Sequence, residues 1–144
     1  MGDTDQKVLA RSYLAMVHMG QDQLGQARDL LSEAQAVARD WPFPPTEAAV
    51  LWAEARLAAA EERWTEALGA FEPLVDTYAQ FGMQWDRART LVDRTGAYAT
   101  RGEAADFGQA RSLLQESYAL FQEMGIPRYA RLVEERLNVL PSPA

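Results

Sequence analysis

The sequence predicts an all-α fold, an α-solenoid made of about three helix pairs and a closing helix. Three observations predict it. Apolar residues recur at helical spacing along most of the 144 residues, and no segment shows the alternation of a strand. One apolar pattern recurs at offsets of 40 and 43 residues. A second pattern, centred on a glycine, recurs at an offset of 43 residues. A repeat period near 40 residues is typical of stacked helix pairs.

The first pattern spaces its members by three, four and three residues, which keeps them on one face of a helix. A small alanine stands second in every copy, where we expect another helix to approach closely. The three copies are Leu24–Ala27–Leu31–Ala34, Trp64–Ala67–Phe71–Leu74 and Phe107–Ala110–Leu114–Ser117.

The second pattern reads Tyr78-x-x-Phe81-Gly82-Met83 and Phe121-x-x-Met124-Gly125-Ile126. Each glycine suits the position just after a helix, where the left-handed backbone of a Schellman cap is needed. The apolar residue that follows folds back on the aromatic residue five positions earlier. Two helices are therefore expected to end just before Gly82 and Gly125.

Seven helices follow from these patterns, over residues 4–19, 22–39, 45–61, 64–81, 84–101, 105–124 and 127–139. They form repeats over residues 4–39, 45–81 and 84–124, with a closing helix at 127–139, in a single domain that spans residues 1–144. The run Trp41 to Pro45 is expected to be a stiff connector, with Pro45 or Thr46 opening the next helix. An extended ligand for an aromatic groove is the alternative for this run.

The helix over residues 64–81 contains Gly69 and Pro73. A proline ring presses on the carbonyl group four residues earlier, which here belongs to Gly69. We expect the helix to continue through Pro73 and to bend near Gly69. On this interpretation Gly69→Ala destabilises the protein, because the methyl group would crowd the bend.

These segments resemble the tetratricopeptide repeat, and especially its longer-period form in the C-terminal regions of bacterial LuxR-type and maltose-activator-type regulators and of ATPase-cyclase signalling proteins. Residues 13–34 (YLAMVHMGQDQLGQARDLLSEA) resemble a repeat core, and residues 88–137 resemble the last repeat and closing helix of such regions. The resemblance implies a right-handed α-solenoid. The glycine that usually ends the incoming helix is replaced by Asp22 and Glu62 in the first two copies, whereas the third copy has Gly102.

The amino-acid composition excludes several classes of partner and of chemical site. The net charge of −7 argues against nucleic acid and membrane partners, because like charges repel. The lack of cysteine excludes disulfides and thiolate zinc sites, and neither metal nor cofactor is expected. The N-terminus is polar and no apolar run is long enough to span a bilayer, which favours a cytoplasmic location. His18 is the single histidine; we expect it in a packed interface, and we expect no catalytic residue.

The inward faces of the incoming helices are the candidate partner-binding groove. A surface with methionine, tryptophan and arginine is typical of peptide-binding sites. The alternative is that Met16 and Trp52 pack in the core. The expected groove residues are Ser12, Met16, Met19, Trp52, Arg56, Arg89 and Asp93.

Residues 83–102 are locally basic in an acidic chain, with four arginines and two aspartates. With Arg89 opposite Trp52 and Arg56, the groove would suit a peptide that has an acidic residue beside an apolar one. The alternative is that these arginines neutralise the acidic second repeat, at Glu54, Glu61 and Glu62.

The predicted function is therefore that of a protein–protein interaction scaffold or sensor, within a larger bacterial signalling or transcription-regulatory protein. A small-molecule effector-binding domain of the same fold is the alternative. Without a polar N-terminal cap, the outer face of residues 4–39 is also expected to support a weak homodimer.

Overall fold

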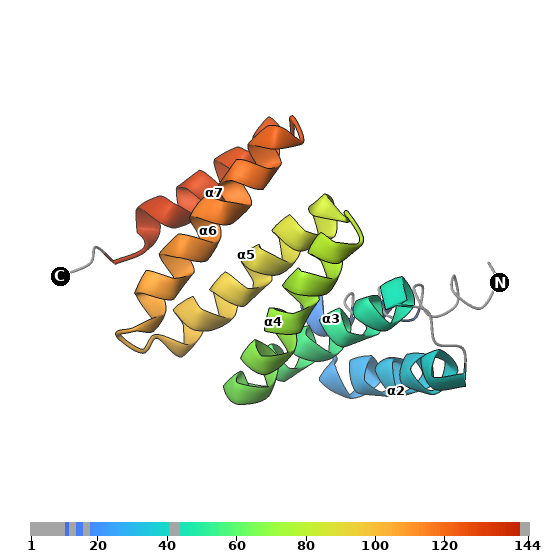
Figure 1. Cartoon of the computed structure of the whole chain (residues 1–144). Helices are drawn as coiled ribbons and strands as arrows, with labels where there is room; N and C mark the ends of the chain where they lie inside the picture. The colour runs from blue at the N-terminus through green and yellow to red at the C-terminus, as the bar shows by residue number, and fades with distance from the viewer. Residues whose placement is uncertain (1–10, 12–13, 16–17, 41–43, 142–144) are drawn as a thin grey trace. The chain divides into compact units, whose positions relative to one another are not determined.

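The computed structural model describes residues 11, 14–15, 18–40 and 44–141, and this part of the chain is all-α. Residues 11, 14–15 and 18–20 are helical, and no strand occurs among the described residues. The bounds of the helices that follow agree with the predicted ones to within two residues. These helices are α2 (Leu24–Asp40), α3 (Pro44–Ala60), α4 (Trp64–Gln80), α5 (Gln84–Arg101), α6 (Asp106–Glu123) and α7 (Pro127–Val139) (Figure 1).

The chain divides into two compact units, residues 1–70 and residues 71–144, and the boundary falls within α4. In the first unit α2 packs against α3. In the second unit α5 packs against α6, and α6 packs against α7 (Figure 1). Each of these pairs is antiparallel, because a connection of a few residues joins its two helices. The single domain expected over residues 1–144 stays a prediction.

Helix ends repeat one geometry. Gly82 and Gly125 have left-handed φ values of 67° and 69°. The amide of Met83 donates to the carbonyl oxygen of Tyr78 at 2.9 Å, and that of Ile126 donates to Phe121 at 3.0 Å. These bonds define a Schellman cap, so both predicted caps are confirmed.

The same cap forms where the sequence lacks glycine. Asp22 and Glu62 have φ values of 59° and 61°. The amide of Gln23 donates to the carbonyl oxygen of His18 at 2.7 Å, and that of Arg63 donates to Ala58 at 2.8 Å. The left-handed conformation has a cost of about 1–2 kcal/mol for a residue such as glutamate and a smaller one for aspartate, so the same turn forms here in spite of the side chain.

This strain predicts a stabilising substitution. Glu62 is exposed, so Glu62→Gly should relieve the left-handed backbone and raise the free energy of unfolding by about 1 kcal/mol. The matched control is Gly82→Ala, which places a side chain on the same backbone geometry and should lower stability by a similar amount. Urea denaturation followed by circular dichroism measures both. Equal effects of the same sign would contradict the interpretation of the turns.

The small residues of the first pattern are buried. Ala27, Ala67 and Ala110 are all 0% exposed. Ser117, also 0% exposed, donates its hydroxyl to the carbonyl oxygen of Ala88 at 3.1 Å, which brings the backbone of α5 against α6. The predicted close approach is confirmed at this crossing.

Each unit has its own apolar core. The core of the first unit joins helical residues before α2 to α2 and α3, and it comprises Ala15, Ala27, Leu31, Ala34, Ala38, Val50, Ala53 and Leu57. The core of the second unit comprises Ala88, Leu91, Leu113, Leu114, Leu120, Phe121, Ala130 and Val133. Leu14 is 46% exposed, and the expected homodimer through residues 4–39 stays a prediction.

Helix α4 continues through Pro73, as predicted. The hydroxyl of Thr77 donates to the carbonyl oxygen of Pro73 at 3.0 Å, one turn further on. A bend near Gly69 stays a prediction. A Cβ atom at Gly69 would meet no atom within 4 Å apart from the nearby backbone of α4 itself, so the crowding expected of Gly69→Ala is not seen around the helix.

We therefore expect Gly69→Ala to stabilise the protein. Alanine lowers the entropy of the unfolded chain and favours a helix over glycine by about 0.8–1 kcal/mol. Thermal denaturation followed by circular dichroism should show a higher Tm. A lower Tm would mean that the helix needs a glycine at this position to bend.

Helix α3 begins at Pro44, one residue before the predicted start. Proline suits the first turn of a helix, where the missing N–H group has no partner to lose. Trp41 to Phe43 lie outside the described residues, so the stiff connector expected over this run stays a prediction.

Candidate partner-binding surfaces

The groove residues expected in the first unit divide into three groups. Ser12 and Met16 lie outside the described residues. Met19 is half-buried and packs against the core of the first unit. Trp52 is only 4% exposed, and the guanidinium carbon of Arg56 lies 5.8 Å from the centre of its ring. Core packing, the alternative for Trp52, is therefore the interpretation that its burial supports.

The groove residues expected in the second unit, Arg89 and Asp93, are half-buried on α5. A terminal nitrogen of Arg89 lies 3.1 Å from Oδ1 of Asp86, one turn earlier on the same helix. Both Arg89 and Asp93 take part in further polar or charged interactions. Their expected place opposite Trp52 and Arg56 joins the two units and stays a prediction.

The four arginines expected to make residues 83–102 basic lie on α5, and sequence reasoning missed that three of them form a regular row. Arg87, Arg94 and Arg101 are spaced by seven residues, which places them on one face of the helix. We call these three residues the arginine row. Forty residues earlier α3 and the turn after it carry Glu47, Glu54 and Glu61 at the same spacing, which we call the glutamate row. The spacing alone could have found both rows, and equivalent positions of successive repeats thus carry opposite charges.

The glutamate row has partners within the first unit. Glu61 accepts hydrogen bonds from Arg63, at 2.7 Å, and from Arg28. The bond from Arg63 is the main cause that lowers the pKa of Glu61, although partial burial opposes it. Glu54 accepts a bond from the amide of Gln35 at 2.5 Å. Glu61 and Glu54 of the glutamate row therefore already have hydrogen-bond partners within the first unit.

A polar pocket of about 280 Å³ lies beside these pairs, between α2, α3 and the start of α4. Two arginines and two glutamates converge on it, together with Ser32 and Gln35, so its lining is more polar than that of most ligand pockets. The face of α3 that carries Glu54 and Leu57 lines it, and Trp52 and Arg56 do not. The lining residues are Arg28, Leu31, Ser32, Gln35, Glu54, Leu57, Arg63, Glu66 and Ala70.

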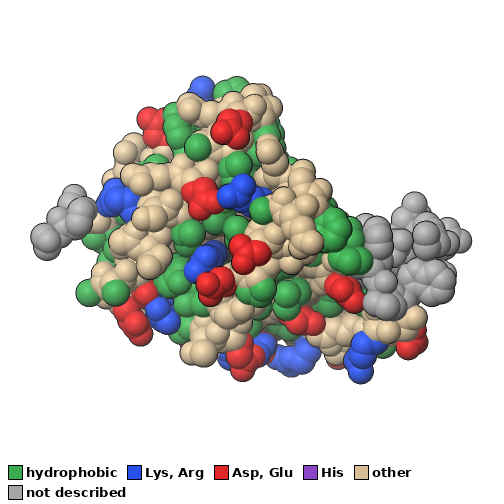
Figure 2. All heavy atoms as spheres, viewed as in Figure 1, with side chains coloured by type: hydrophobic (Ala, Val, Ile, Leu, Met, Phe, Trp, Pro, Cys, Tyr) green, Lys and Arg blue, Asp and Glu red, His purple; other side chains and the backbone are tan. Residues whose placement is uncertain are grey.

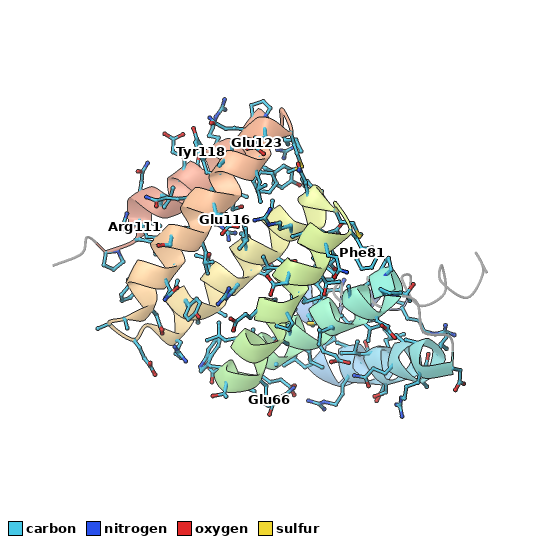
Figure 3. All side chains as sticks on the ribbon, viewed as in Figure 1. Glu66, Phe81, Arg111, Glu116, Tyr118 and Glu123 are labelled. Carbon is cyan, nitrogen blue, oxygen red and sulfur yellow. The ribbon has the colours of Figure 1, made fainter. Side chains whose placement is uncertain are left out.

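The arginine row pairs with α6 at its two ends. A terminal nitrogen of Arg87 donates to Oε1 of Glu116 at 2.6 Å. Arg101 donates to both oxygens of Asp106, at 2.8 and 2.5 Å. Figure 2 shows basic and acidic side chains side by side over α5 and α6, and Figure 3 shows Glu116 on the α5 side of α6.

The Arg101–Asp106 pair closes the turn between α5 and α6. Gly102, with φ 73°, ends α5, and the amide of Glu103 donates to Oδ2 of Asp106 at 3.2 Å. Asp106 is 3% exposed. The Arg101 guanidinium is the main cause that holds the pKa of Asp106 below its ordinary value, and Asp106 in turn raises the pKa of Arg101. The bidentate geometry marks this pair as structural.

Arg94, in the middle of the row, differs from the two ends because it forms no ion pair with a described carboxylate. Its guanidinium carbon lies 5.7 Å from the centre of the Tyr98 ring, and Arg101 lies at the same distance from that ring. The Nε atom of Arg94, like those of Arg87 and Arg89, is buried and has no hydrogen-bond partner among the described residues. No described carboxylate forms an ion pair with Arg94.

His18 is half-buried, and its Nδ1 atom lies 2.6 Å from the side-chain oxygen of Gln23, across the turn before α2. It therefore stabilises a turn instead of filling a core. Over the described ranges no group of three His, Asp or Glu side chains is placed to hold a metal ion. None of the helices in those ranges has the length and apolar character to cross a membrane.

Comparison with known proteins identifies no relative: no family model, no curated protein and no solved structure matches the chain.

Proposed function

We propose that the chain is a protein-interaction module of tetratricopeptide-like repeats, which binds a segment of another protein on its helical surface. The observation that supports the proposal is the recurrence of one turn. A left-handed residue with the same backbone hydrogen bonds follows the helices at Asp22 and Glu62, and again at Gly82 and Gly125. Stacked helix pairs of this kind present extended surfaces, and binding other proteins is what such surfaces suit.

The proposal makes the module the scaffold or sensor part of a larger bacterial signalling or transcription protein, in line with the resemblance of residues 88–137. A protein or peptide is a better partner than nucleic acid for a chain with a net charge of −7. The proposal assigns neither a catalytic role nor a cofactor to the chain.

Selection from a random peptide library displayed on phage tests the proposal. We expect related sequences to be enriched on the folded chain, and synthetic copies to bind with dissociation constants on the order of micromolar. Fluorescence anisotropy measures the affinity, and heat-denatured chain is the control for selection. If binding uses the expected groove, Arg56→Glu with Arg89→Glu should abolish it while the Tm holds. Equal enrichment on folded and denatured chain would contradict the proposal.

The polar pocket of the first unit favours a second candidate, a small-molecule effector domain. Its convergent arginines and glutamates would recognise a molecule that carries both charges or several hydroxyl groups. A thermal-shift screen with amino acids, sugars and nucleotides tests it. A specific rise in Tm should disappear in Ser32→Phe, which fills the pocket. No rise with any compound of the screen would leave peptide binding as the better proposal.

A further inference from the structure

We propose that Arg94 is a binding site for a carboxylate, carried by an Asp or Glu side chain of the partner protein. The site is the middle position of the arginine row on α5. It differs from the expected groove, whose member on the same helix is Arg89.

The two ends of the row already have carboxylates from α6, at Glu116 and Asp106. Because α5 and α6 are antiparallel, Arg94 lies level with the middle of the segment between those two acids. Residues 107–115 read FGQARSLLQ and contain no Asp or Glu. Helix α6, whose acids pair with Arg87 and Arg101, therefore offers no carboxylate to Arg94.

The guanidinium of Arg94 is nevertheless held in place. Tyr98 lies one turn further along α5, and its ring contacts the cation at 5.7 Å, a favourable arrangement for a cation beside an aromatic ring. The Nε atom is buried, and losing its water without gaining a partner has a free-energy cost. Arg94 as a whole is half-buried, and Nε is the one of its nitrogens that is buried without a partner, so the two terminal nitrogens are the donors that a ligand would reach.

A carboxylate is the acceptor that fits these donors. A guanidinium presents parallel N–H groups that match the two oxygens of a carboxylate, and the charge strengthens both bonds. A positioned side chain gains more from such a bond than a mobile one, because less conformational entropy is lost on binding. The inference that the carboxylate belongs to a protein rests on the proposed function. The inference that Arg94 binds a carboxylate does not.

The Nε–Hε signals of the arginines in a ¹H–¹⁵N correlation spectrum test the site. The probe is the blocked peptide Ac-Ala-Glu-Ala-NH₂, and the matched control is Ac-Ala-Gln-Ala-NH₂ at the same ionic strength. We expect the Arg94 signal to shift and saturate with the glutamate peptide only. Arg94→Gln should weaken binding of this peptide by at least about tenfold.

The matched control variant is Arg111→Gln. Arg111 lies on α6 at about the same level as Arg94, but its side chain donates to the carbonyl oxygen of Pro141 after α7 and points away from α5 (Figure 3), so this variant should bind the peptide unchanged. Because Arg94 has no carboxylate to lose, Arg94→Gln should also keep its Tm. If that variant fails to fold, the signal of the unmodified protein still decides the question.

Several results would overturn the proposal. An Arg94 signal that does not move, equal shifts of all arginine signals, or an equal response to the glutamine peptide would each show that Arg94 takes no carboxylate. Tighter saturation by inorganic phosphate would assign the site to phosphate instead. If the peptide-library selection fails but the Arg94 signal shifts and saturates, the proposed function is rejected and the carboxylate site is kept. If the selection succeeds but the Arg94 signal does not move, the carboxylate site alone is rejected.

Discussion

Phe121→Ala is expected to lower the free energy of unfolding of the second unit by about 3–5 kcal/mol, which is the usual cost of removing a buried phenylalanine. Phe121 is 1% exposed and lies at the centre of an aromatic cluster. Its ring centre lies 5.7 Å from that of Trp85, at the start of α5, and 5.4 Å from that of Tyr129, on α7. The substitution therefore removes packing that joins three helices at once. Urea denaturation followed by circular dichroism measures the loss.

The control is Phe81→Ala at the end of α4. Phe81 is 46% exposed and is labelled in Figure 3. A substitution at such a site should change stability by about 0.5 kcal/mol or less. The two phenylalanines occupy different positions of the glycine pattern, since Phe121 corresponds to Tyr78. Similar losses in both variants would mean that the aromatic cluster does not carry the packing of the second unit.

Asp106→Asn should lower the free energy of unfolding by about 2 kcal/mol at pH 7, because bonds between charged partners contribute about 1.5–3 kcal/mol. The change replaces a nearly buried carboxylate that receives two hydrogen bonds from Arg101. It also weakens the bond from the amide of Glu103, which shapes the turn before α6. Glu116→Gln is the control, because Glu116 is 42% exposed and an exposed ion pair contributes about 0–1 kcal/mol.

The same pair predicts a dependence on pH. The pKa of Asp106 is lower in the folded chain than its ordinary value, chiefly through the bonds from Arg101. Its contribution to stability is therefore fully present above the unfolded pKa of about 3.9, and it is lost as the pH falls through the lower folded pKa. The difference between the original chain and Asp106→Asn should shrink below about pH 4. A difference that stays constant down to pH 2 would contradict the assignment of the shift to Asp106.

The helices and most of their ends were predictable, because both depend on residues near each other in the sequence. Apolar residues three and four apart predict a helix whatever its neighbours are. Gly82 and Gly125 predict left-handed caps, since glycine adopts that conformation without a steric cost. The first pattern predicted the burial of Ala27, Ala67 and Ala110, because its spacing places them on one face of a helix.

The candidate sites were less predictable, because they depend on which helix faces each side chain. Helical projection placed Trp52 in a groove, yet the side chain is 4% exposed. The same projection favoured Arg89 over Arg94, although both are arginines on α5. Arg94 has no carboxylate from α6 because the part of α6 that lies beside it, between Asp106 and Glu116, contains no Asp or Glu.

The sequence by itself thus determined the helical class of the chain, the order and bounds of its helices, and the glycine caps, because these follow from local periodicity and backbone freedom. Only the tertiary structure decided the left-handed backbone of Asp22 and Glu62, which their own conformational preferences oppose. It also decided the burial of Asp106 against Arg101 and the lack of an ion pair between Arg94 and a described carboxylate. The first two features depend on how the chain turns between helices and the third on the register between α5 and α6, and none of them follows from the periodicity of a single helix.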